Sequence, residues 1–148
     1  MWIYKNEELD EQNIPEKALG FVYTITHKPS GKVYIGKKLL TKAATRQVNG
    51  RKIKCRKPSD WKEYWSSSPT LKEWIAEEGI ENFHREILTF CFSKSSLTYC
   101  EEMSMFVLGV LERPEKFINE NIRSKMYRSW VKGKEEIAEL RERLKTFD

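Results

Sequence analysis

Two adjacent glutamates, Glu101 and Glu102, lie in an otherwise strongly apolar segment and are candidates for binding a metal. The apolar spacing of residues 94–111 predicts a helix, with Ser93 as its cap. At about 100° per residue, Glu102 falls at the centre of the polar face, whereas Glu101 falls at the edge of the buried stripe. A carboxylate at such a boundary can point into a cleft, and hard cations such as Mg²⁺ prefer carboxylate ligands. Glu101 is therefore the expected ligand, and Glu102 is expected to face water.

Two tyrosines, Tyr23 and Tyr34, occupy short apolar segments that alternate as β-strands do, at residues 21–26 and 32–36. A turn at residues 28–31 joins them into a hairpin. Side chains on neighbouring strands can meet on one face of a sheet. A phenol is a poor base at its ordinary pKa near 10. Lys37 and Lys38 follow the second strand directly and are expected to lower that pKa.

A run of basic residues between positions 37 and 57 is a candidate phosphate-binding surface, because it contains no acidic residue. The alternative is a solvated basic loop. Aromatic side chains follow the run, and Trp61 among them is expected either to contact DNA or to join the core. The run consists of Lys37, Lys38, Lys42, Arg46, Arg51, Lys52, Lys54, Arg56 and Lys57.

Composition indicates a single folded domain with a modest net charge of +5 over 148 residues. No apolar run approaches the roughly 20 residues that span a bilayer. The polar, acidic N-terminus does not have the pattern of a signal peptide, so a cytoplasmic location is expected. The odd number of cysteines and their spacing exclude a typical structural zinc site. Cys91 and Cys100 are expected in the core, and His27 and His84 are expected to be structural or solvated.

The order of predicted elements is a hairpin, a helix, a strand and a helix, which indicates an α+β domain. Its three-stranded antiparallel sheet is flanked by helices. The other predicted segments are a helix at 70–78, a third strand at 82–92, a tail at 117–122 that returns to the core, and a helical extension at 124–148 broken near Gly133. Residues 37–58 are expected to start a helix or extended arm and then form a basic loop or small hairpin, with a turn at Asn49-Gly50.

Three stretches together resemble the GIY-YIG endonucleases, and in particular a small phage-encoded, homing-endonuclease-like subgroup. Tyr34-Ile35-Gly36 matches the second half of the family signature. Gly20-Phe21-Val22-Tyr23 is similar to the first half, although its glycine lies one residue further back and Val22 replaces isoleucine. Residues 93–101 match an S-K-x-x-x-x-Y-x-E stretch. The resemblance covers residues 20–122, which leaves an N-terminal arm at 1–19 and a C-terminal helical extension at 123–148.

The resemblance implies a metal-dependent DNA endonuclease. Glu101 would hold Mg²⁺ or Mn²⁺, and one of Tyr23 and Tyr34 would activate a water while the other orients it or the phosphate. The family's arginine, which binds the scissile phosphate from a helix after the second signature strand, is assigned to Arg46, with Arg51 and Arg56 as rivals. The family's asparagine is assigned to Asn119, in an orienting role.

The expected partner is double-stranded DNA, and no membrane is expected to be bound. The sequence leaves open whether the chain is a monomer or a homodimer. Two alternatives to the enzyme remain. The chain could be a catalytically inactive module that binds DNA with a nuclease-like fold. It could also be an interaction domain that engages a protein through residues 124–148.

Overall fold

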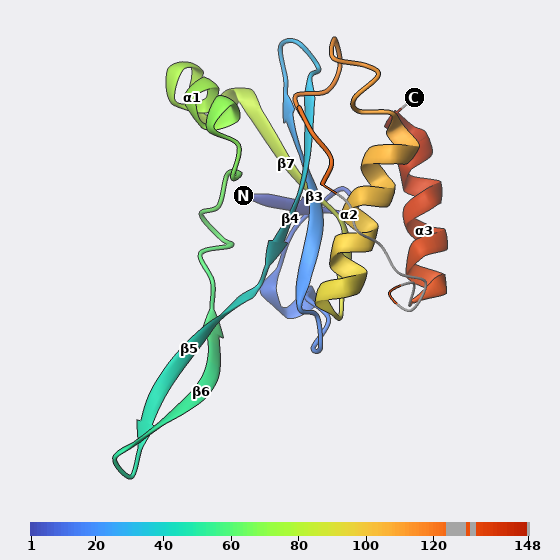
Figure 1. Ribbon diagram of the computed structural model, residues 1–148. Coiled ribbons are helices and arrows are strands. Elements are labelled where there is room, and N and C mark those ends of the chain that lie inside the picture. The colour runs from blue at the N-terminus through green and yellow to red at the C-terminus, as the bar shows by residue number, and fades with distance from the viewer. Residues whose placement is uncertain (124–129, 131–132, 148) are drawn as a thin grey trace.

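A computed structural model gives the fold of the chain and describes residues 1–123, 130 and 133–147 (Figure 1). One main sheet contains five strands, and a separate sheet contains two. The elements in chain order are β1 (Trp2–Tyr4), β2 (Glu7–Glu8), η1 (Glu11–Asn13), β3 (Gly20–His27), β4 (Val33–Leu39), β5 (Thr41–Val48), β6 (Arg51–Pro58), α1 (Pro69–Glu78), η2 (Ile80–Asn82), β7 (Phe83–Cys91), α2 (Lys94–Leu108), α3 (Lys134–Leu144) and η4 (Lys145–Phe147).

The main sheet has the strand order β2-β1-β7-β3-β4, so β4 forms one of its edges. Strand β3 lies between β7 and β4 and is antiparallel to both, as the three-stranded prediction requires. The N-terminal segment adds the two remaining strands, because Trp2–Tyr4 pairs with β7 in parallel. The α+β class is therefore confirmed, whereas the sheet is mixed and five-stranded rather than antiparallel and three-stranded.

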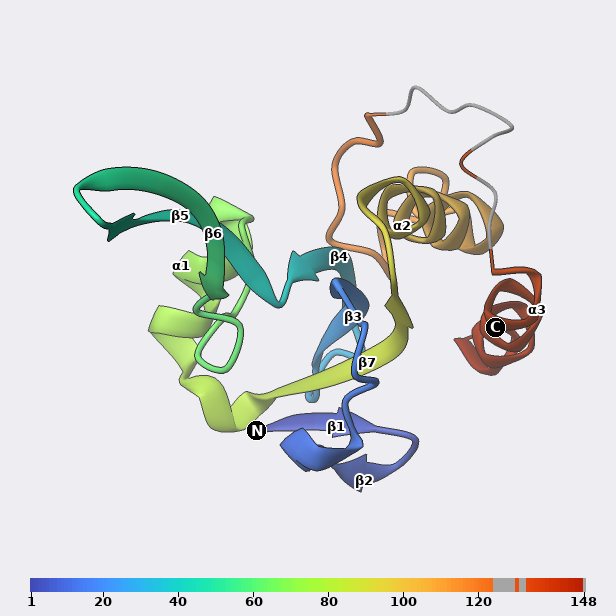
Figure 2. The ribbon, with the colours of Figure 1, turned by 90° about the horizontal axis from the view of Figure 1, so that it is seen from below.

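Two apolar cores lie on opposite faces of this sheet. Helices α2 and α3 cover one face, and α1 with the segment before it covers the other (Figure 2). Alternation along β3 supplies both cores, since Val22 belongs to the first and Tyr23 to the second. On the second face, residues 59–68 pack over β3 and carry Trp61 into the core.

The helices begin where capping residues were expected. Ser68 accepts a hydrogen bond from the Leu71 amide at the start of α1, and Ser93 does the same for Ser96 at the start of α2. Helix α2 ends at Leu108, earlier than predicted. Gly109 adopts φ +61° there and closes the helix with a left-handed cap, so Pro114 plays no part in its termination.

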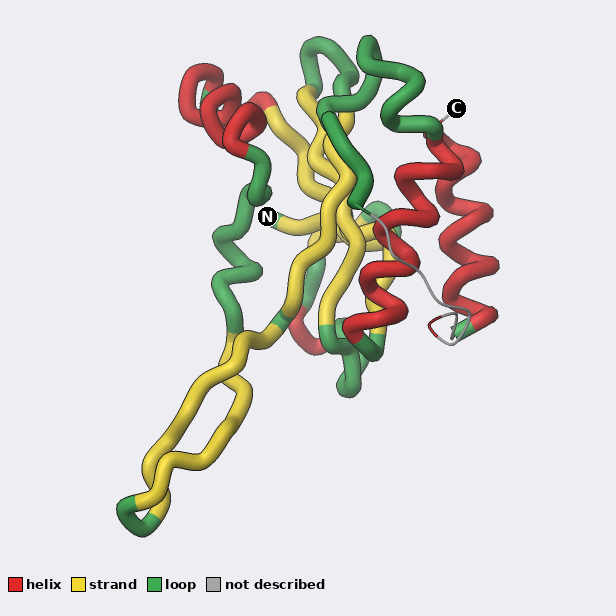
Figure 3. Tube along the Cα trace, in the orientation of Figure 1, coloured by secondary structure: helices red, strands yellow, loops and turns green. Residues whose placement is uncertain are grey.

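Residues 41–58 form a long β-hairpin, β5–β6, that extends away from the rest of the molecule (Figure 3). The predicted turn at Asn49-Gly50 is present, with φ +50° and φ +72°. Of the alternatives predicted for residues 37–58, the helix is wrong, whereas the extended arm and the hairpin are confirmed. Leu39 ends β4 and Leu40 is buried at the base of the hairpin, so the apolar spacing that suggested a helix reflects the end of one strand and the start of another.

The chain after α2 returns to the sheet as predicted. Phe117 forms a parallel bridge with Val33 of β4. Helix α3 then packs Ile137, Leu140 and Leu144 against the first core, which confirms the helical spacing there. The rest of the predicted extension, residues 124–129, 131–132 and 148, lies outside the described residues. No described helix has the length and apolarity that crossing a membrane requires.

Candidate active site at the edge of the sheet

Tyr23 and Tyr34 lie on the same face of the sheet, beside its β4 edge. Tyr23 pairs with Gly36, and Ile25 pairs with Tyr34, which places the two rings side by side with centroids 6.3 Å apart. A Cβ atom at position 36 would overlap the Tyr23 hydroxyl and would lie 2.6 Å from its Cζ. Gly36 is therefore required because the Tyr23 side chain crosses β4 at that residue.

A loop before α1 brings further hydroxyls to the two phenols. Tyr64 packs edge-on against Tyr23 at 6.0 Å, and hydrogen bonds with Ser66 affect both tyrosines. Ser66 is fully buried and holds φ +119°, which is strained for a residue with a side chain. Its Oγ accepts a hydrogen bond from the Ser68 amide. No local sequence pattern predicted this position of Ser66.

Arg85 of β7 fixes the position of that loop. Its guanidinium stacks between Trp2 and Trp65 and donates hydrogen bonds to the carbonyls of Lys62 and Tyr64. Burial lowers the pKa of Arg85 to about 10. The buried cation therefore serves the packing of the loop. No feature of the sequence pattern distinguished it from a surface arginine in β7.

Burial controls the pKa of both phenols. It raises the pKa of Tyr23 well above its ordinary value and also raises that of Tyr34. The expectation that Lys37 and Lys38 lower these values is wrong. Lys38 stacks over the Tyr64 ring and pairs with Asp60, and Lys37 turns toward α2. Both tyrosines therefore carry their protons at neutral pH, and each can donate one hydrogen bond and accept another.

Glu101 reaches the same edge of β4 from α2. Its Oε1 lies 3.9 Å from the Lys37 ammonium, and only 15% of its side chain is exposed. Burial raises the pKa of Glu101 to about 7, opposed by the Lys37 charge and by a hydrogen bond from the Lys37 backbone amide. The Glu101 charge in turn contributes to the raised pKa of Tyr34, so the two groups are neighbours.

Glu102 differs from the prediction that it faces water. The residue is only 4% exposed, and its Oε2 has no hydrogen-bond partner among the described residues. Burial raises the pKa of Glu102, and the Lys37 charge opposes that shift. The helical wheel missed this burial because it counts only the spacing within α2, whereas Lys37 of β4 lies close enough for its charge to act on the Glu102 carboxyl.

Asn119 secures the backbone of β4 between Tyr34 and Gly36. Its Oδ1 accepts a hydrogen bond from the Ile35 amide at 2.9 Å, and its Nδ2 donates to the Ile35 carbonyl at 2.8 Å. The side-chain amide thereby replaces a neighbouring strand at the sheet edge. Asn119 thus holds the strand that carries Tyr34 in place, and its contacts suit the orienting role assigned to it.

A single carboxylate suits a magnesium ion that keeps most of its water ligands. The described residues contain no group of three or more histidine, cysteine or acidic side chains that could enclose a metal. Glu101 nevertheless fits the part of a lone hard ligand. Its carboxylate lies at the strand edge, and its pKa is raised because burial outweighs the effect of the Lys37 charge.

Two clefts open on either side of this edge. A polar cleft of about 420 Å³ is lined by Tyr34, Ser67, Asn119 and Arg123, among others. A second cleft, of about 450 Å³, lies at the base of the hairpin. Its cations are Lys37, Lys38, Lys42 and Lys94. Arg123 and Lys94 were not identified from the sequence, since neither lies in the basic run.

Two predicted site residues lie elsewhere. Arg46 is exposed on β5, opposite Ile53, in the projecting hairpin. The chain after Gly36 continues as a strand rather than the expected helix, so Arg46 is not brought to the tyrosines and the assignment is corrected. The prediction that Trp61 contacts DNA is also wrong, since Trp61 is 8% exposed and packs on Phe21 in the core. Arg51 and Arg56 likewise belong to the hairpin.

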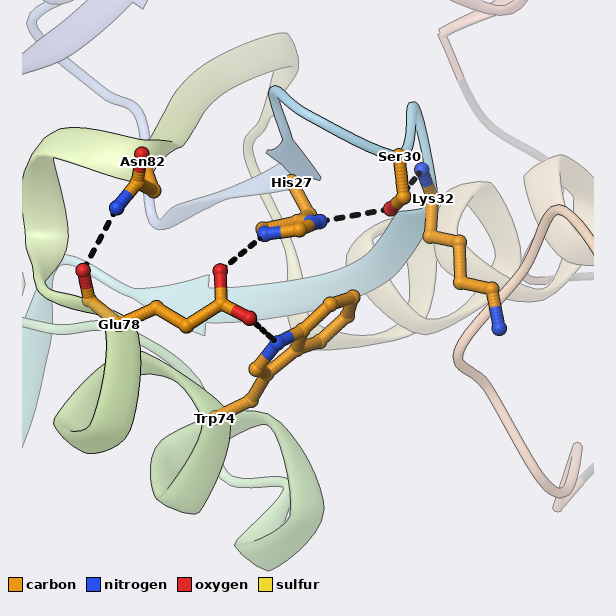
Figure 4. A network of polar contacts seen from close by, with 6 residues as sticks. All are labelled: His27, Ser30, Lys32, Trp74, Glu78 and Asn82. Atoms are coloured by element: carbon orange, nitrogen blue, oxygen red, sulfur yellow. Dashed lines mark hydrogen bonds and ion pairs between the residues drawn. The ribbon is translucent and has the colours of Figure 1, made fainter.

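A polar network outside the site ties the β3–β4 turn to α1 (Figure 4). His27 is buried, and its ring contacts Ser30 Oγ at 2.7 Å and Glu78 Oε2 at 2.5 Å. Hydrogen bonds from Trp74 and then His27 lower the pKa of the Glu78 carboxyl. The network fixes the turn that sets the register of the two tyrosine strands, in agreement with the structural role expected for His27.

Comparison with known proteins gives one match. The family described as "Putative endonuclease segE, GIY-YIG domain" matches residues 2–122. The matched range includes β1, β2 and both tyrosine strands. It also includes the whole of α2, which carries Glu101, and Asn119. No curated protein and no solved structure gives a significant match.

Proposed function

Because the chain belongs to the GIY-YIG endonuclease superfamily, we propose that it is a divalent-metal-dependent endonuclease that hydrolyses phosphodiester bonds in double-stranded DNA. The observation that carries the proposal is that two tyrosines and one mostly buried carboxylate lie at the β4 edge. Tyr23 lies over Gly36, Tyr34 lies beside it, and Glu101 approaches from α2. The site lies between a polar cleft and a cationic cleft, which suits a strand of DNA passing over the edge.

The two phenols have different roles because they differ in exposure. Tyr34 is partly exposed and lines the polar cleft, so its hydroxyl contacts the attacking water or a phosphoryl oxygen. Tyr23 is 1% exposed and orients Tyr34 and the neighbouring hydroxyls from within the core. Since both phenols are neutral at pH 7, they act as paired donors and acceptors and not as phenolate bases.

Charge at the scissile phosphate comes from several groups. Glu101 would hold Mg²⁺ or Mn²⁺, which supplies positive charge on the phosphoryl oxygens and lowers the pKa of bound water. Lys37, 3.9 Å from Glu101, places an ammonium at the same edge. Arg123 places a guanidinium in the cleft that Tyr34 lines. In this reaction water forms a bond to phosphorus and loses a proton to solvent, the bond between phosphorus and one sugar oxygen breaks, and that leaving oxygen takes up a proton.

Cleavage of supercoiled plasmid tests the proposal. The wild-type protein is expected to nick or linearise the plasmid with Mg²⁺ or Mn²⁺ and to leave it intact in EDTA. Glu101→Gln is expected to lower the rate by about 10³-fold. Glu115→Gln is the matched control, because Glu115 is exposed and outside the site, and it should cut like the wild type.

The inactive binding module gives a different pattern. Plasmid that is shifted on a gel at low salt but never cut, over several metals and DNA substrates, would contradict the enzyme and support that module. Equal cutting by wild type and Glu101→Gln would show that the activity belongs to a contaminant or to another site.

A further inference from the structure

The β5–β6 hairpin has no core of its own. None of its strand residues is buried, and even Val48 and Ile53 are 37% and 41% exposed. An isolated two-stranded hairpin is at best marginally stable in water. With eight residues in each strand at about 3.3 Å each, the arm is about 25 Å long. Such an arm, lacking intramolecular partners along its length, is suited to an external one.

The charge of the hairpin identifies that partner as a polyanion. Seven cations and no carboxylate lie between Thr41 and Pro58. Lys42 and Lys57 are directly paired across the strands, and like charges in that relation are destabilising. An anion that binds both ammoniums removes the repulsion, and regularly spaced phosphates supply such anions along a DNA backbone.

The two faces of the hairpin carry different side chains. On one face Lys52, Lys54 and Arg56 follow one another along β6, opposite Gln47, Thr45 and Ala43 of β5. This face presents a row of cations beside small polar residues. The other face has Lys42 and Lys57 at its base, Ala44, Cys55 and Ile53 with Arg46 in its middle, and Val48 with Arg51 at its tip. Apolar groups of this kind can contact thymine methyl groups in the major groove.

The side chains that suit base recognition lie near the tip. Arg46, Gln47 and Arg51 belong to the three cross-strand pairs nearest the turn. All three are exposed. Arginine can bind guanine and glutamine can bind adenine through two hydrogen bonds in the major groove. Asn49 has a structural part, since it holds the turn at φ +50°.

The base of the hairpin connects it to the candidate active site. The Ser59 amide donates to the Leu40 carbonyl at 2.9 Å, and the Ser59 hydroxyl donates to the Leu39 carbonyl at 2.6 Å, which closes the base. The cationic cleft lies there and contains both Lys42 of the hairpin and Lys37, which neighbours Glu101. A DNA backbone can therefore run from the β4 edge through this cleft to the arm.

We propose that the β5–β6 hairpin enters the major groove as a two-stranded ribbon and that its tip is the sequence-reading element of the enzyme. The inference rests on the proposed function for its substrate, double-stranded DNA. The major groove is about 12 Å wide and admits a β-ribbon. The arm is about 25 Å long, shorter than a helical turn of about 34 Å, so the arm itself spans less than one turn of the duplex.

Binding selection in EDTA tests this role separately from cleavage. Protein is incubated with a pool of randomised 30-bp duplexes, and the bound fraction is sequenced. We expect the wild type to enrich a motif. Arg46→Lys/Arg51→Lys keeps the charge but loses the two-pronged contacts, so it should bind the pool within about threefold of wild type while the enrichment falls by at least about tenfold. Lys52→Gln/Lys54→Gln should bind about tenfold more weakly and enrich the same motif.

Two further variants and a groove probe complete the test. Replacing residues 41–58 by Asn-Gly, a two-residue turn across the closed base, should abolish the enrichment while circular dichroism shows the fold retained. Lys17→Gln, an exposed lysine outside the hairpin, should change nothing. The major-groove ligand methyl green should displace the wild type, whereas the minor-groove ligand distamycin should not.

Enrichment of the same motif by the excised protein or by Arg46→Lys/Arg51→Lys would overturn the inference, as would a wild type that enriches none. Failure of the proposed function looks different. In that case the wild type still enriches a hairpin-dependent motif in EDTA but does not cut that motif when metal is added.

Discussion

The β4 edge and the β5–β6 hairpin follow one another in the chain but differ in how they present their functional groups. At the edge, Tyr23 is buried in a core, crosses Gly36 and is held by packing. On the hairpin, the cations stand in solvent on two strands without a core. Changes at the edge should therefore alter stability and chemistry together, whereas changes on the hairpin should alter DNA binding alone.

Among changes that affect stability and cleavage together, Gly36→Ala is expected to have the largest effect. The new Cβ would overlap the Tyr23 side chain, which is packed on Tyr64 and Trp2 and has no room to move. We expect a loss of about 2–3 kcal/mol in the free energy of unfolding and at least about 10²-fold in the cleavage rate. Urea denaturation and plasmid cleavage measure the two. Thr45→Ala on the hairpin is the comparison and should leave both unchanged, and a fully active, stable Gly36→Ala would show that Tyr23 does not need this position.

Asn119→Ala removes the pair of hydrogen bonds that holds Ile35 at the strand edge. The expected cost is about 1–2 kcal/mol in stability and about 10- to 100-fold in rate, because Tyr34 and Gly36 flank the freed peptide unit. Asn121→Ala, an exposed neighbour in the polar cleft, serves as control. If the two variants cleave equally well, Asn119 does not position Tyr34.

Glu101 should make stability depend on pH in a direction opposite to that of an ordinary ion-paired carboxylate. Its pKa in the folded protein is about 7, above the ordinary value of 4.5, so the folded state binds the proton more tightly. Its contribution to stability is fully present below about pH 4.5 and is lost as pH rises through 7. In EDTA at pH 8, Glu101→Gln should therefore be more stable than the wild type by about 1–2 kcal/mol, and the gap should close near pH 5.

Metal should reverse that order, since it binds the ionised carboxylate. With Mg²⁺, wild-type cleavage should rise as pH increases through about 7, the pKa of Glu101. Thermal melts at pH 5 and pH 8, with and without metal, measure the first effect, and the pH–rate profile measures the second. A Glu101→Gln protein less stable than wild type at pH 8 in EDTA would show that the carboxylate is satisfied within the protein.

The contrast between the two regions also explains what the sequence predicted. Local signals sufficed for the strands around Tyr23 and Tyr34, for the caps Ser68 and Ser93, and for the returning tail at Phe117. Each depends on residue types within a few positions, and tertiary packing agreed with them. The family resemblance suggested Glu101 through a short, continuous motif and Asn119 through its place after the glutamate helix, and the structure places both beside β4.

Errors arose where the outcome depended on a distant partner. Glu102 was expected to face water because a helical wheel contains only α2 and not the elements that pack around it, such as β4 with Lys37. Trp61 seemed available to DNA because the sequence does not show that Trp2 docks beside it, with its Nε1 bonded to the Trp61 carbonyl. The role of Arg85 depends on two tryptophans from separate segments. These are long-range contacts, which no local pattern encodes.

The hairpin should show the smallest effect on stability and a distinct effect on binding. Lys52→Gln/Lys54→Gln removes two exposed cations that form no hydrogen bond or ion pair with the described residues. The free energy of unfolding should therefore change by less than about 0.5 kcal/mol. If each lysine neutralises one phosphate, the slope of log K against log salt should fall in magnitude by about 1.8. Titrations between 50 and 200 mM salt in EDTA measure it, with Lys17→Gln as the control. A slope equal to that of the wild type would mean that this face of the hairpin does not lie on the DNA backbone. The backbone contacts would then lie in the cationic cleft alone, at Lys37, Lys38, Lys42 and Lys94.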